Sequence, residues 1–152
     1  MNKDRGFEIV SNYKGKNINL PKRQTTNSAG YDIEAAEDTL IPVFHPGQKP
    51  ILVKTGIKAY FKCNEFLMLV NRSSNPLKKG LVVSNGIGIV DSDYYNNPSN
   101  EGHIMFSFYN FSDKDIIIQK GDRIGQAIFS NFLISDNDTA CGSRVGGFGS
   151  TM

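Results

Sequence analysis

The sequence predicts a single all-β domain, a jelly-roll-like barrel or sandwich with at most one short helix. Residues that favour strands are abundant, with 15 Ile, 8 Val, 10 Phe and 6 Tyr, whereas Leu and Ala number only 8 and 6. Residues that favour turns are also frequent, with 15 Gly, 15 Asn and 6 Pro among 152 residues. This length and pattern exclude a coiled coil, a helix bundle and a multidomain protein.

Six segments have the composition of strands and are bounded by Gly, Asn, Asp, Ser or Pro. In chain order they are residues 51–61, 66–70, 81–90, 103–111, 116–119 and 124–132. Residues 75–80 predict a short helical turn that ends at Gly80. The dipeptide Asn85-Gly86 predicts a type I′ hairpin, which can be purely structural. Because Gly88 follows closely, exposed backbone here could also hydrogen-bond the edge of a planar ligand.

Charge and sequence features narrow the partners and the compartment. The chain has 17 basic and 15 acidic residues, a net charge of +2, which argues against a nucleic-acid partner but allows a small anionic ligand. No apolar run approaches the roughly 18 residues of a membrane-spanning helix, and the polar start is not a secretory signal. Cys63 and Cys141 stand outside any CxxC spacing and are expected to be reduced thiols of a cytoplasmic protein.

The sequence lacks the residue patterns of several common catalytic and metal-binding sites. The sequence contains no Walker A lysine, no HExxH and no Cys/His zinc cluster. Its two histidines, His45 and His103, are isolated in sequence, so neither is expected to be a metal ligand or part of a Ser-His-Asp triad.

Polar residues beside predicted strands are the remaining candidates for chemistry. Asp91 follows a strand, where a carboxylate can orient and deprotonate water, although taken alone an Asx turn that ends the strand is the more common explanation. Arg72-Ser73-Ser74 combines a cation with two hydroxyls, a set that suits phosphate but also occurs in ordinary polar loops. Gln126 falls within a predicted strand, which is unusual for a plain core position.

The C-terminal residues predict an arm, residues 144–152, that follows a domain of residues 1–143. Residues 144–151 combine three glycines with a cation, an aromatic ring and two hydroxyls. Glycine-rich backbone can wrap anionic oxygens, and an aromatic ring can stack on a flat base. The alternative is an ordinary flexible tail.

With these segments in order, the chain resembles trimeric dUTPases (deoxyuridine 5′-triphosphate nucleotidohydrolases). The resemblance covers residues 29–151 and rests on five motifs: Ala29-Gly30-Tyr31-Asp32-Ile33, Arg72-Ser73-Ser74, residues 85–94, Gly121-Asp122-Arg123-Ile124-Gly125-Gln126, and Arg144 with residues 146–151. It implies a jelly-roll homotrimer whose three active sites are each built from all three subunits. It also implies Mg²⁺-dependent hydrolysis of dUTP to dUMP and pyrophosphate, which keeps dUTP low and supplies dUMP for dTMP synthesis.

The resemblance also implies roles for individual residues. Asp91 would hold the water that attacks the α-phosphorus in line, and Asp32 would reach a Mg²⁺ ion through water. Tyr94 would pack under the deoxyribose and crowd out a 2′-hydroxyl. The implied phosphate contacts are Arg72, Ser73, Ser74 and Gln126. The implied uracil contacts are Asn85, Ile89, Val90 and Met105. The implied arm contacts are Arg144, Phe148, Gly149, Ser150 and Thr151.

Four features depart from the family pattern. Asn71 replaces the usual proline and Ser74 the usual glycine around the second motif, and residues 95–102 lengthen the loop after Tyr94. The fifth motif is one residue shorter than in many members.

Two other functions remain open at this level. A dCTP deaminase of the same fold would need a catalytic glutamate near the base, and Glu101 is the only one nearby. A regulatory nucleotide-binding module acting through a protein partner is a second alternative, because fold alone does not determine function.

Overall fold

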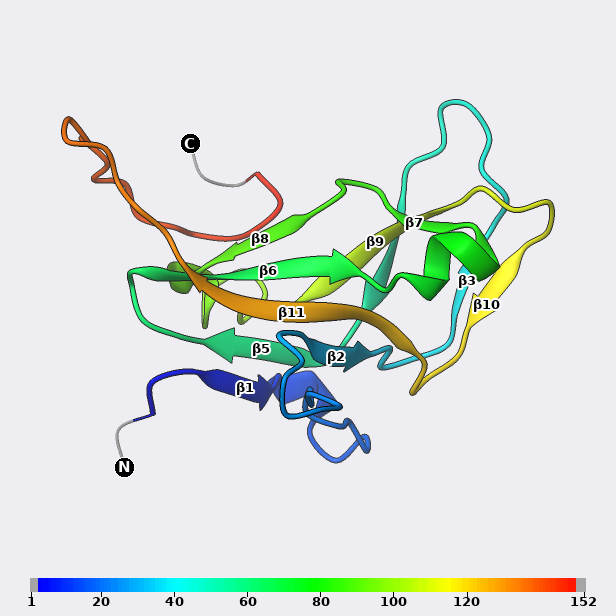
Figure 1. The fold of residues 1–152 in the computed structure, drawn as a ribbon, viewed down its shortest axis with the longest axis horizontal. Coiled ribbons are helices and arrows are strands. Elements are labelled where there is room, and N and C mark those ends of the chain that lie inside the picture. The colour runs from blue at the N-terminus through cyan, green and yellow to red at the C-terminus, as the bar shows by residue number, and fades with distance from the viewer. Residues whose placement is uncertain (1–2, 150–152) are drawn as a thin grey trace.

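A computed structural model describes residues 3–149 and confirms the all-β jelly-roll class (Figure 1). Helical structure in the described part is confined to three short turns, η1 (Ser11–Tyr13), η2 (Asn75–Lys79) and η3 (Ser92–Tyr94). The strands are β1 (Gly6–Ile9), β2 (Tyr31–Glu34), β3 (Thr39–Ile41), β4 (Ile51–Lys54), β5 (Ile57–Tyr60), β6 (Glu65–Asn71), β7 (Leu81–Val83), β8 (Gly88–Asp91), β9 (Met105–Asn110), β10 (Ile116–Ile118) and β11 (Arg123–Asn131).

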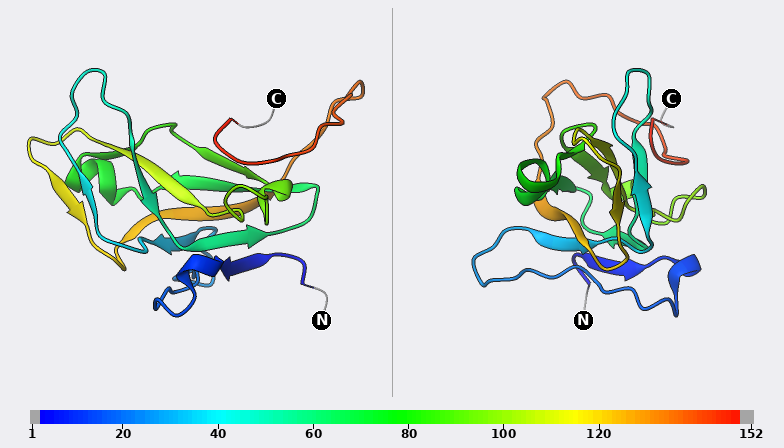
Figure 2. Two further views of the ribbon diagram at one scale, coloured as in Figure 1. Left: turned by 180° about the vertical axis from the view of Figure 1, so that it is seen from behind. Right: turned by 90° about the vertical axis from the view of Figure 1, so that its right-hand side faces the viewer.

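Two larger sheets enclose the core. One has the strand order β2-β11-β6-β8 and the other β4-β9-β7, and every pairing is antiparallel. Two-stranded sheets β1-β5 and β3-β10 complete the fold. Both views show β1 on one side of the molecule and the end of the described chain on the opposite side, beyond β8 (Figures 1 and 2).

Alternating side chains form this core, as expected for sheets with one buried face. Along β9 the buried residues are every second one, including Phe106 and Phe108, which are 2% and 0% exposed. Gly125 of β11 lies against the Phe106 ring, where an added Cβ would come within 2.3 Å of a ring carbon. The glycine therefore lets the two larger sheets approach closely at this point.

The structure corrects the predicted strand over residues 51–61. It is divided into β4 and β5, which belong to different sheets, because Gly56 adopts a φ of +71° between them. Thr55 stabilises this corner by donating its hydroxyl hydrogen to the Ile104 carbonyl over 2.5 Å.

The predicted type I′ hairpin at Asn85-Gly86 is also wrong. Gly86 has a positive φ of 71°, but Asn85 does not, and β7 and β8 pair with β9 and β6 rather than with each other. The turn carries the chain from one sheet to the other. By contrast, the predicted helical turn is present as η2, and Gly80 ends it in the left-handed region with a φ of 66°.

No helix within residues 3–149 is long and apolar enough to cross a bilayer. Cys63 and Cys141 are free, exposed thiols.

We expect His103 to make the protein less stable in mild acid. Its buried Nε2 accepts a hydrogen bond from the Gly56 amide over 2.9 Å. Burial, reinforced by Lys54, lowers the pKa of His103 from 6.5 to about 4, although Glu37 and Glu101 act in the opposite direction. Because the unfolded chain takes up the proton first, His103 stabilises the fold fully above pH 6.5. That contribution falls toward pH 4 by up to about 1.4 kcal/mol per pH unit.

Urea unfolding between pH 7 and 5 measures this slope. His103→Gln should flatten the dependence, since a glutamine oxygen can accept the same bond without titrating. The matched control is His45→Gln, because His45 is exposed. A slope that survives in His103→Gln would assign the acid sensitivity to other groups.

Candidate active site

A pocket of about 260 Å³ lies where β8, the start of β9 and the C-terminal residues meet. Its lining combines glycines and apolar side chains with two charged groups, Asp91 and Arg144. The lining residues are Leu69, Asn85, Gly88, Ile89, Val90, Asp91, Tyr94, Ile104, Met105, Arg144, Gly147, Phe148 and Gly149.

The end of β8 places a carboxylate at this pocket. Val90 is buried at 8% exposure and Ile89 is exposed at 58%, so the strand alternates between core and pocket side. Asp91 is the last residue of β8, and its side chain is 53% exposed. A carboxylate held at a rigid strand end yet open to water can orient and deprotonate a water molecule.

Arg144 joins the C-terminal segment to two acidic residues at the end of β8 and in η3, Asp91 and Asp93. Its Nη2 donates to Asp91 Oδ2, and its Nε donates to Asp93 Oδ1 over 2.6 Å. A third bond, 3.2 Å from Nη1 to the Gly146 carbonyl, orients the guanidinium. The arginine side chain is only 14% exposed. The cation therefore balances two neighbouring carboxylates at the pocket.

Tyr94 forms one wall of the pocket and is 8% exposed. Its hydroxyl donates to the His103 carbonyl over 2.7 Å, and burial raises the pKa of this hydroxyl. Gly147 lies against the ring, because an added Cβ would come within 2.5 Å of Tyr94 Cε2. Only a glycine lets the C-terminal backbone pass this close to the ring.

A second polar cluster lies on β2 and β11. Asp32 and Gln126 are directly paired across these strands, and Gln126 Nε2 donates to Asp32 Oδ1 over 3.1 Å. Arg123 donates to the other oxygen, Oδ2, over 3.2 Å. Arg72, just beyond β6, donates to the Arg123 carbonyl over 3.1 Å. Asp32 is 7% exposed, so this buried carboxyl group is paired with one cationic and one amide donor.

The register separates the two clusters within one chain. Asp91 pairs with Phe66 at the start of β6, whereas Asn71 pairs with Gly125 at its end. Arg72 therefore lies six residues along the sheet from Asp91, about 20 Å at roughly 3.3 Å per residue.

The structure thus divides the predicted site residues into two sets. The pocket collects Asn85, Ile89, Val90, Asp91, Tyr94, Met105, Arg144, Phe148 and Gly149. The second cluster holds Asp32, Arg72 and Gln126, and Ser73 and Ser74 follow Arg72. Ser150 and Thr151 lie outside the described residues.

Sequence reasoning missed two ionic partners of this site. Arg123 was recognised as part of a turn motif, but its pairing with Asp32 depends on the β2-β11 register. Asp93 stands two residues after Asp91 in the sequence, and its pairing with Arg144 depends on the path of the C-terminal segment. The two acidic residues in sequence were a signal for a cationic partner, without indicating which one.

Fold and site together define a jelly-roll protein with a half-apolar, nucleoside-sized pocket bounded by charged groups. The family model described as dUTPase matches residues 16–152. The chain belongs to the dUTPase family.

Two similar proteins are both named deoxyuridine 5′-triphosphate nucleotidohydrolase. The chain is 52% identical over 151 residues, 98% of both chains, to the deoxyuridine 5′-triphosphate nucleotidohydrolase of Lactococcus lactis. It is 36% identical to the enzyme of that name from Haemophilus ducreyi, over 94% of this chain and 93% of the relative.

A solved structure supports the fold. The crystal structure of dUTPase from Streptococcus mutans matches with a TM-score of 0.80 and 46% identity. The match covers 87% of this chain and 99% of that chain. A dUTPase mutant from phage phi11 of S. aureus, at 18% identity and a TM-score of 0.70, shares the fold.

Proposed function

We propose that the chain hydrolyses dUTP to dUMP and pyrophosphate, which lowers dUTP and supplies dUMP for dTMP synthesis. Family membership and the names of the relatives support this reaction. The observation that carries it is the pocket beside β8, which places apolar side chains next to an exposed carboxylate and an arginine.

In this proposal the pocket holds uracil and deoxyribose. Uracil presents an acceptor–donor–acceptor edge, which backbone groups near Ile89, Val90 and Met105, together with the Asn85 amide, can complement. Cytosine reverses part of this edge and would leave buried groups unpaired, which discriminates strongly. The Tyr94 ring packs under the sugar and leaves no room for a 2′-hydroxyl.

Asp91 is the proposed general base. It takes a proton from a water molecule that attacks the α-phosphorus in line with the pyrophosphate leaving group. Arg144 is bonded to Asp91 in the structure, and the triphosphate would compete for this cation. Once transferred to the phosphates, the guanidinium stabilises the charge that develops on the leaving group and frees the carboxylate for the water.

Arg72, Ser73, Ser74 and Gln126 are the proposed phosphate ligands. Within residues 3–149 no three His, Cys, Asp or Glu side chains gather into a metal site. The residues present therefore fit a Mg²⁺ ion that is held mainly by triphosphate oxygens and water, with Asp32 acting through water. When bound, Mg²⁺ supplies charge neutralisation for the triphosphate. Coordination of a structural Mg(II) ion is described for the phage phi11 dUTPase mutant.

The two clusters support a homotrimer with shared sites. At a separation of about 20 Å, the α-phosphorus cannot lie beside Asp91 while Arg72 of the same chain binds the adjoining phosphates. A second subunit can bring its own Arg72 cluster to the pocket. The exposed side chains of Phe132, Leu133 and Ile134 leave an apolar surface for such packing.

We also propose that residues 144–152 form an arm that closes over the site, on a domain of residues 1–143. Phe148 lines the pocket and is 68% exposed, so it is placed to cover a base. A cytoplasmic location completes the proposal, supported by the two free thiols.

The deaminase alternative is not favoured. Glu101, the glutamate it would need near the base, binds Lys58 and Ser11 on the other side of its loop. A regulatory role through a protein partner would be additional to hydrolysis.

We expect purified protein with Mg²⁺ to release pyrophosphate from dUTP, with little release from dCTP, dTTP or UTP. The physical reason is the complementarity of the pocket to the uracil edge and to deoxyribose. A four-nucleotide panel with pyrophosphate detection measures this. Equal turnover of dCTP accompanied by ammonia would instead identify a deaminase.

A further inference from the structure

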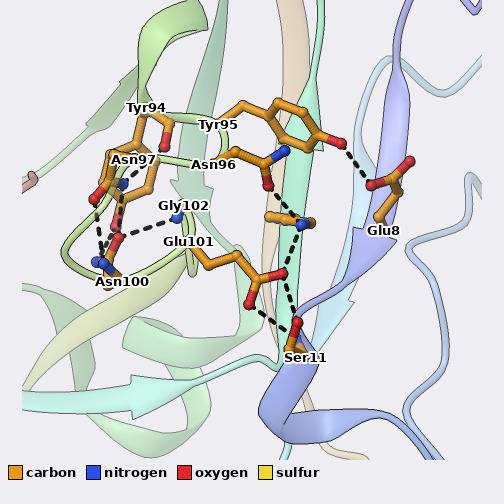
Figure 3. Close-up of polar contacts among 10 residues, drawn as sticks. Glu8, Ser11, Tyr94, Tyr95, Asn96, Asn97, Asn100, Glu101 and Gly102 are labelled. Carbon is orange, nitrogen blue, oxygen red and sulfur yellow. Dashed lines mark hydrogen bonds and ion pairs between the residues drawn. The ribbon is translucent and has the colours of Figure 1, made fainter.

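The loop of residues 95–102 closes on itself through buried polar groups (Figure 3). Asn97 is 5% exposed and accepts hydrogen bonds from the Ser99 and Asn100 amides over 3.1 and 3.2 Å. Its Nδ2 donates to Asn100 Oδ1 over 2.7 Å and to the Tyr94 carbonyl over 2.8 Å. The loop is therefore folded around two asparagine side chains.

The outer side of the same loop is anchored to the barrel. Lys58 of β5 is 8% exposed and donates to both Asn96 Oδ1 and Glu101 Oε1 over 2.6 Å. Glu101 also accepts a bond from the Ser11 amide over 3.0 Å, and the Lys58 bond lowers its pKa to about 2. The loop is thus held to β5 by an ion pair and to η1 by hydrogen bonds throughout the neutral pH range.

Its inner side reaches the active-site tyrosine. Asn100 Nδ2 donates to the Tyr94 hydroxyl over 2.8 Å, while that hydroxyl donates to the His103 carbonyl. The backbone also closes tightly here, since a Cβ on Gly102 would come within 2.7 Å of the Tyr94 carbonyl. Tyr94 is therefore held at both ends, at its carbonyl by Asn97 and at its hydroxyl by Asn100.

We propose that Asn100 is a positioning residue that fixes the Tyr94 ring and thereby sets selectivity for deoxyribose over ribose. The inference rests on the proposed function, because it concerns the sugar subsite of that reaction. The ring excludes a 2′-hydroxyl only while it cannot withdraw, and Asn100 is the side chain that ties its hydroxyl to the anchored loop. Loss of this bond leaves the Tyr94 hydroxyl with only its bond to the His103 carbonyl, so the ring is less firmly held against movement away from the sugar.

The test compares kcat/KM for dUTP with kcat/KM for UTP in the full-length protein. Asn100→Ala is expected to lower this ratio by about tenfold, the scale of one hydrogen bond. Ser99→Ala is the matched control, because its hydroxyl bonds to Asn97 Oδ1 rather than to Tyr94. It should leave the ratio within about twofold of the unaltered protein.

A double-mutant cycle separates positioning from general loop stability. In Tyr94→Phe the hydroxyl is absent, so adding Asn100→Ala should change the ratio no further. An equal effect of Asn100→Ala in both backgrounds would overturn the proposal. Should Asn100→Ala fail to fold by circular dichroism, Tyr94→Phe alone decides, because an unchanged ratio there also overturns it.

The outcomes distinguish this inference from the proposed function. Unaltered protein that does not hydrolyse dUTP rejects the function. Normal dUTP hydrolysis with an unchanged dUTP-to-UTP ratio in Asn100→Ala rejects only the positioning role.

Discussion

Asp91→Asn should reduce kcat for dUTP hydrolysis by about 10²–10⁴-fold while the protein remains folded and binds nucleotide. The asparagine has nearly the same shape but cannot accept the proton from the attacking water, and general-base catalysis contributes on this scale. The side chain is 53% exposed at a strand end, so the substitution leaves the core unchanged. Single-turnover kinetics give the rate, and calorimetry with a non-hydrolysable dUTP analogue gives the affinity.

Asp93→Asn is the matched control for this experiment. It removes the same charge two residues away, and Asp93 also pairs with Arg144. Loss of the ion pair alone would affect both variants similarly, whereas loss of the base affects only Asp91→Asn. Turnover of Asp91→Asn within a few-fold of the unaltered rate would reject Asp91 as the base.

Ending the chain after Ser143 should lower kcat/KM for dUTP by at least about 10²-fold, the scale for loss of one transition-state charge contact. The truncation removes Arg144 from the phosphates and Phe148 from the base. The fold should persist, since among the described residues none after Phe129 belongs to the hydrophobic core. Pyrophosphate release gives the rate, and thermal unfolding shows whether the barrel is intact.

Two point variants refine this result. Arg144→Ala should reproduce most of the loss, because it removes the cation and keeps the chain. Val145→Ala, at a neighbouring residue that is 60% exposed, should be nearly silent. Full activity in the truncated protein would show that residues 144–152 are an ordinary tail.

Much of the fold could be predicted because strand propensity and turn residues mark its elements locally. Segments such as 66–70 and 116–119 correspond closely to β6 and β10. The strands β1, β2 and β3 were missed, because they are only three or four residues long and mix polar with apolar positions. The division between β4 and β5 was also missed. It depends on the positive φ of Gly56, which the residues on either side of it do not predict.

In the candidate site, too, single residues could be predicted from the sequence but their contacts could not. Asp91, Arg144 and Gln126 could be named as candidates from the sequence, because each is a polar residue within a recognisable motif. Their partners could not be named. The bond between Gln126 and Asp32 requires the β2-β11 register, and the bonds of Arg144 require two segments more than 50 residues apart to meet.

The sequence by itself determined an all-β domain, the list of candidate site residues and the resemblance to dUTPases. These depend on residue type and order along the chain, which the sequence states directly. Only the tertiary structure decided that the cluster of Asp32, Arg72 and Gln126 and the Asp91 pocket lie at opposite ends of β6, and that the loop of residues 95–102 holds Tyr94. Strand register and loop closure arise from contacts between distant residues, whose geometry no local pattern contains.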